Sequence, residues 1–194
     1  MKTEAIVVSS KGQGMDAALA QAEAVGAQLG LGGREAIHLR LLAEEMMNMM
    51  RSIIGALQGR FWIEADGGEY RLYLKTVTLM DSEQRAQLIG ASTSGKNEAH
   101  RGIMGKIRAF FEPMPIDDTP AYLVEAIESD PNGDLTWSLE AYRERLRRNK
   151  DNGGEAGDEW DELEKSLVTH LADDVKVSIR GNDVELTIFK AYRK

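Results

Sequence analysis

Glu44 and Asn48 are the residues whose types and spacing most directly suggest chemistry in this chain of 194 residues. A spacing of four places both side chains on one face of a helix. A carboxylate and a neighbouring amide can together present oxygen atoms to one ligand, or to a hard cation such as Mg²⁺. The same pair also fits a plain solvated face, because polar residues commonly form the outer side of an amphipathic helix.

A second group of candidate residues lies in the segment 91–106. It combines a polar loop with a glycine-containing helix start and includes Ser94, Gly95, Lys96, Asn97, Gly102, Gly105 and Lys106. Backbone N–H groups of such a loop, a lysine and a helix N-terminus all attract anions, so this segment is a candidate phosphate site. The run 90–97 also matches a P-loop except at Asn97. A true P-loop directly follows a buried strand. The run 82–90 before this loop is instead polar and helix-like, so we do not assign the P-loop motif.

Short apolar runs and helical periodicities predict the elements that would position these residues. A β-branched run predicts a strand over 3–9, and Asp66-Gly67 between two strand-like runs predicts a hairpin. A second hairpin is predicted at the end of the chain. The full set is strands at 3–9, 59–65, 70–80, 174–180 and 183–192, with helices at 15–29, 34–57, 82–90, 98–112, 137–148 and 158–171.

This order favours an α/β (α+β) two-layer sandwich, in which helices cover one face of a mostly antiparallel mixed sheet. We expect one domain over 1–194, with an insertion at about 113–156 that holds all four prolines and one helix. In the helix 34–57, the recurrence of Ile37, Leu41, Met47 (or Met46), Met50 and Ile54 predicts the stripe that faces the core, and the methionines are expected to fill it.

The layout and its polar residues together resemble the histidine-kinase-like ATPase superfamily, whose fold is also called the Bergerat fold. The run Glu44-Glu45-Met46-Met47-Asn48 matches the E-x-x-x-N motif of its anti-sigma-factor kinases. The resemblance implies that Asn48 ligates the Mg²⁺ of bound ATP and that Glu44 is the catalytic group near the γ-phosphate. It also implies that Asp81 binds adenine and that the segments 92–97 and 101–106 hold the phosphates.

One departure from the family follows Asp81. Ser82 and Glu83 stand where the family carries a glycine box, and those glycines let the backbone pass close to the base. Two functions therefore stay open. The first is a regulatory protein that binds ATP with Mg²⁺, or an anti-sigma-type protein serine kinase. The alternative is a non-catalytic interaction module of the same fold that has lost nucleotide binding and contacts a protein partner through 113–156.

Composition limits the classes of partner and compartment. The net charge of −8 disfavours nucleic acid and anionic membranes, which need a dominant basic field. The absence of cysteine excludes disulfides, thiolate catalysis and cysteine-ligated zinc. No apolar run has the length of a membrane span, and the first residues lack the apolar core of a signal peptide. We therefore expect a cytoplasmic protein. Its small ligand, an adenine nucleotide, is what the resemblance implies.

Overall fold

The computed structural model of the chain describes residues 1–50, 58–77, 127–129, 135–151, 167–180 and 182–192. Its described elements follow one another in the order β1 (Ile6–Ser9), α1 (Met15–Gln28), α2 (Gly33–Met49), β2 (Gln58–Asp66), β3 (Glu69–Val77), β4 (Ile127–Ser129), β5 (Leu135–Ser138), α6 (Leu139–Asp151), α8 (Leu167–Leu171), β6 (Asp174–Arg180) and β7 (Asp183–Ala191). The first strand, the first helix and both hairpins therefore lie where the sequence predicts them.

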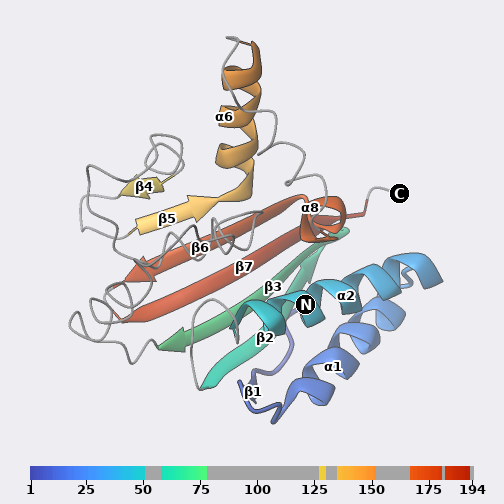
Figure 1. Ribbon diagram of the computed structural model, residues 1–194. Helices are drawn as coiled ribbons and strands as arrows, with labels where there is room; N and C mark the ends of the chain where they lie inside the picture. The colour runs from blue at the N-terminus through green and yellow to red at the C-terminus, as the bar shows by residue number, and fades with distance from the viewer. Residues whose placement is uncertain (51–57, 78–126, 130–134, 152–166, 181, 193–194) are drawn as a thin grey trace.

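The strands form one seven-stranded sheet in the order β1-β2-β3-β7-β6-β5-β4 (Figure 1). Every described pairing is antiparallel. The two hairpins, which are far apart in the sequence, are joined by the pairing of β3 with β7. The α+β class and the antiparallel sheet are confirmed, whereas the described strands contain no parallel pair that would make the sheet mixed. The histidine-kinase-like ATPase fold itself stays a prediction.

Rows of opposed residues define the face of the sheet that carries the core. In antiparallel strands, directly opposed residues point to the same face, and neighbours along a strand point to opposite faces. One buried row crosses the sheet from β2 to β5 through Phe61, Leu74, Leu186, Val177 and Trp137. This row explains why apolar residues alternate with polar ones along β2, β3, β6 and β7.

Helices α1 and α2 pack against each other and against the inner face of the sheet (Figure 1). The inner side of α1 is made of small residues, including the fully buried Ala18 and Ala22. Gly26 allows the closest approach of the two helices, because a Cβ at this position would lie 3.2 Å from the Cβ of Ala36 in α2. Gly30, with φ of 70°, then reverses the chain between the helices.

The buried stripe of α2 agrees with the predicted one only in part. Ile37 is 58% exposed, Leu41 is only partly buried, and Ile54 lies outside the described residues. The buried positions are Leu39, Leu42, Ala43, Met46, Met47, Met49 and Met50. At 3.6 residues per turn, Ile37, Glu44 and Asn48 share the opposite, exposed face. The prediction that Ile37 belongs to the core was therefore wrong, whereas the buried Met46, Met47 and Met50 confirm the predicted core role of the methionines.

The described part of the stretch 113–156 adds two strands to the sheet. β5 pairs with β6, and β4 pairs with β5 at the sheet edge. The sequence predicted a helix from Trp137, but Trp137 is a buried strand residue and α6 begins at Leu139. Ser138 caps this helix, because its Oγ accepts the Ala141 N–H at 3.2 Å. The run Leu135-Thr136-Trp137-Ser138 does alternate apolar and polar residues, but it has the minimum length for such a pattern and continues directly into a helix, so the sequence analysis assigned Trp137 to the helix.

Candidate functional site

Glu44 and Asn48 lie one turn apart near the end of α2, and both are exposed. Glu45 lies beside them and is half-buried. Burial, followed by the negative charge of Glu44, raises the pKa of Glu45, and a hydrogen bond with the Asn48 side chain acts in the opposite direction. This end of α2 therefore presents two carboxylates and an amide together, on the side of the helix that faces away from the sheet.

The remaining predicted site residues lie outside the described residues. They are Asp81, Ser94, Gly95, Lys96, Asn97, Gly102, Gly105 and Lys106. Their roles in binding adenine and phosphate accordingly stay predictions. Of the predicted site, the structure places Glu44 and Asn48, and it confirms their common helix face.

One cavity, of about 920 Å³, lies at the end of the sheet near the turn between β2 and β3. Tyr70 and Tyr192 meet there edge to face, with ring centres 5.4 Å apart, and the Tyr192 hydroxyl donates to the Glu35 carbonyl at 3.1 Å. Glu35 and Glu69 also line it. Glu35 accepts the Gly32 N–H at the start of α2, and Glu69 pairs with Arg71. These carboxylates thus already hold parts of the fold together.

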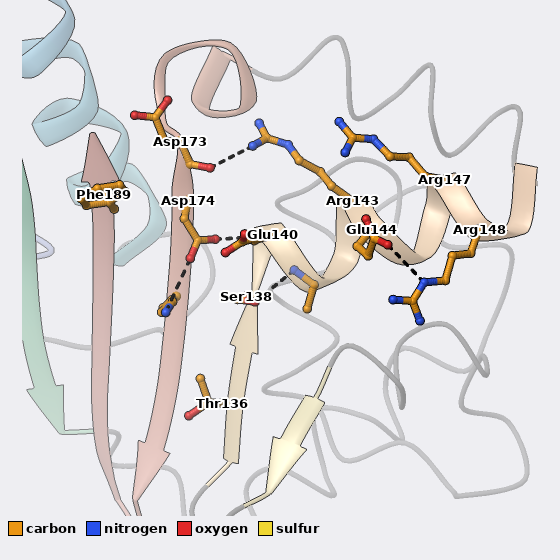
Figure 2. A pocket seen from close by; sticks show the side chains of 12 residues that line it. Thr136, Ser138, Glu140, Arg143, Glu144, Arg147, Arg148, Asp173, Asp174 and Phe189 are labelled. Atoms are coloured by element: carbon orange, nitrogen blue, oxygen red, sulfur yellow. Dashed lines mark hydrogen bonds and ion pairs between the residues drawn. The ribbon is translucent and has the colours of Figure 1, made fainter. Parts of the chain in front are cut away.

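A second cavity, of about 700 Å³, lies between α6 and the strands β5, β6 and β7 (Figure 2). Thr136, Ser138 and Lys176 line it. They alternate along their strands with the buried Trp137 and Val177, so this cavity opens on the face of the sheet opposite the core. Its helix wall carries Arg143, Arg147 and Arg148 together with Glu140 and Glu144.

Asp174 joins α6 to the sheet at the base of this cavity. Its Oδ1 accepts the Glu140 N–H at 3.0 Å and the Val175 N–H at 2.9 Å. Its Oδ2 lies 3.8 Å from the Lys176 ammonium. Asp174 is only 6% exposed, and this burial raises the pKa of its carboxyl although both backbone N–H groups lower it. The side chain therefore acts as a second cap for α6, supplied by a distant strand.

Asp173 and Arg143 hold the adjoining turn. The Asp173 carboxylate accepts the Ala191 N–H at 2.7 Å and pairs with Lys190 at 3.0 Å. Its backbone carbonyl accepts from Arg143 Nη1 at 3.0 Å, while Arg143 Nη2 donates to the Thr169 carbonyl at 2.6 Å. Burial lowers the pKa of the Arg143 guanidinium, although Asp174 opposes this shift. Arg143 is consequently fixed in one orientation at the cavity wall.

The sequence identified only part of this second site. The predicted helix 137–148 already contains Arg143 and Arg147, and the predicted strand 174–180 already begins at Asp174. Nothing in the sequence indicated that the Asp174 side chain is buried. Its cap on α6 joins residues that are far apart in the sequence, and no local pattern encodes such a contact. The usable signal was an acidic residue directly before an apolar strand.

The described part of the chain contains no group of three or more His, Cys, Asp or Glu side chains placed to hold a metal ion. None of the helices in the described ranges combines the length and apolar character of a membrane span. No protein-family model matches the sequence, and no curated protein matches it.

Proposed function

We propose that the chain binds an adenine nucleotide with Mg²⁺ and acts as a regulatory ATP-binding protein of the anti-sigma-kinase type. The observation that carries the proposal is the common helix face of Glu44 and Asn48 on α2, although neither side chain lines either of the two cavities described above. The motif E-x-x-x-N on this helix and the anion-binding composition of the segment 91–106 support the same function. The proposed ligands remain ATP and Mg²⁺. The proposed site remains the ten residues named above.

The donor set at the end of α2 fits Mg²⁺, which prefers oxygen ligands and keeps several waters. Asn48 would supply an amide oxygen, and Glu44 would face the γ-phosphate. The raised pKa of Glu45 reflects burial and the nearby Glu44 charge. A divalent cation would offset this repulsion and neutralise part of the phosphate charge. The core contacts of α2 lie on its other face, so ligand binding would leave them in place.

Asn48→Ala tests this proposal directly. Thermal unfolding with ATP or ADP, with and without Mg²⁺, should show stabilisation of the natural chain, because a ligand that binds only the folded state adds about 2.7 kcal/mol at a hundredfold excess over Kd. Asn48→Ala should reduce the part of the nucleotide-induced stabilisation that depends on Mg²⁺. Ile37→Ala is the matched control, since Ile37 is exposed on the same face of α2 but carries no donor.

Lys96→Ala separates the phosphate contact from the base contact. We expect it to weaken ATP and ADP binding more than adenosine binding, because only phosphates meet the lysine. Equal losses for all three ligands, or none, would contradict a phosphate-holding role for this segment.

The second candidate function is an interaction module without nucleotide binding. Two observations favour it. Ser82 and Glu83 replace the glycine box, and the described part of 113–156 extends the sheet and forms a wall of the cavity beside α6. Absence of any nucleotide-dependent stabilisation, with Mg²⁺ present, would favour this function over the first.

A further inference from the structure

The carboxylates that line the cavity beside α6 are mostly occupied by other groups. Asp173 pairs with Lys190 and accepts a backbone N–H, and Asp174 accepts two backbone N–H groups. Glu144 pairs with Arg148 one turn further along the helix. Among the described lining carboxylates, Glu140 alone forms no ion pair and accepts no N–H group, although its charge acts on Arg143.

Two arginines of the cavity form no ion pair with a described carboxylate, although the charges of Asp174, Asp173 and Glu140 act on Arg143. Within the described residues, Arg143 donates to the neutral carbonyls of Thr169 and Asp173, and Arg147 has no hydrogen-bond or ion-pair partner. Figure 2 shows both arginines extending along the same side of α6. Their spacing of four makes them neighbours, and like charges at this spacing destabilise a helix. The charge of Arg147 accordingly helps to lower the pKa of Arg143.

We propose that this cavity binds a small ligand that presents a phosphate or carboxylate group to Arg143 and Arg147. The guanidinium of Arg143 is already oriented by its two carbonyl contacts, which reduces the entropy lost on binding. Arginine has five N–H donors, so Arg143 retains donors for an oxyanion. Ser138 Oγ accepts the Ala141 N–H, so its own hydroxyl hydrogen can also point to the ligand.

The size and position of the cavity suit such a ligand. A volume of about 700 Å³ lies within the usual range for small-molecule sites. Lys176, exposed on β6 and 3.8 Å from Asp174 Oδ2, adds a further positive charge at the floor, and the half-buried ring of Phe189 adds apolar surface. The cavity opens on the face of the sheet opposite α2, so it shares no residue with the proposed nucleotide site and the two sites can be tested separately.

Titration of the isotope-labelled full chain by NMR tests the proposal, with inorganic phosphate and acetate as probes at constant ionic strength. The backbone amides of α6 should shift with a saturable dependence on one or both anions. Arg147→Ala should weaken this binding by about tenfold or more, because it removes a charge-assisted hydrogen bond. Arg34→Ala is the control, since it removes the same charge from an exposed helix position outside the cavity.

Glu140→Gln gives a result that loss of structure cannot imitate. It removes the one carboxylate of the described lining that forms no ion pair and accepts no N–H group, so we expect affinity for the anion to rise a few-fold. The relative strength of phosphate and acetate identifies which group the natural ligand carries. The proposal would be overturned if the shifts grew linearly with anion concentration without saturating. It would also be overturned if the anion bound with equal affinity to the natural chain, Arg147→Ala and Glu140→Gln. Asn48 lies outside this cavity, so Asn48→Ala should leave phosphate binding beside α6 unchanged.

Discussion

Asp174 offers the sharpest test of how the cavity beside α6 is held together. Replacement by alanine removes the acceptor of two N–H groups, those of Glu140 and Val175. The Val175 N–H is buried, and leaving it unpaired costs about 1–3 kcal/mol. The Glu140 N–H is partly reachable by water, so its loss resembles removal of an ordinary helix cap, about 1 kcal/mol. We therefore expect Asp174→Ala to lower the free energy of unfolding by about 2–4 kcal/mol.

Asp174→Asn is the matched variant, because its amide oxygen can still accept both N–H groups. It loses the contact with Lys176, which at 3.8 Å to an exposed ammonium contributes little. It also removes the cost of burying a charge. Urea unfolding with linear extrapolation should therefore show less than about 1 kcal/mol of destabilisation at pH 7.

The pH dependence gives a second measurement on the same pair. The folded pKa of Asp174 lies above its usual value of 3.8, because burial disfavours the charged form. The folded state then binds the proton more tightly than the unfolded state, so this stabilisation is complete below 3.8 and is lost as pH rises through the folded pKa. Asp174→Asn cannot titrate at this position, so it should not lose stability in this pH range. The free energy of unfolding of Asp174→Asn, compared with that of the natural chain, should therefore improve as pH rises from low pH to pH 7. Equal destabilisation by alanine and asparagine would refute the acceptor role.

Two further substitutions test the fold that supports both sites. Ile37→Ala should change stability by no more than about 0.5 kcal/mol, whereas Leu39→Ala on the buried face should cost about 2–5 kcal/mol, both measured by urea unfolding; the reverse order would contradict the observed face of α2. Gly14→Ala should destabilise the chain clearly more than Gly12→Ala, since both have positive φ but only at Gly14 would a Cβ overlap the Val7 carbonyl. Similar thermal midpoints for the two glycine variants would show that this overlap is relieved by movement of the chain.

Local patterns in the sequence were sufficient for the elements whose signal lies within a few residues. Asp66 and Gly67 predicted the hairpin of β2 and β3, and the structure places Gly67 and Gly68 at φ of 56° and 94° in its turn. Apolar residues alternate with polar ones along these strands, and the buried residues Phe61, Ile63, Leu72 and Leu74 all follow this alternation. The helical spacing of Glu44 and Asn48 predicted their common face, because this geometry depends only on the helix repeat.

Tertiary packing decided what a local pattern leaves open. Several faces of α2 are apolar. The helical spacing predicted the burial of the methionines, but only contact with the rest of the fold determines that Leu39 is buried while Ile37 is exposed. Trp137 lies in a strand because β6 supplies its hydrogen-bonding partner. Asp174 becomes a helix cap because β6 and α6 meet in space. The cavity beside α6 depends on the same meeting of distant segments, so it can be found only in the folded chain.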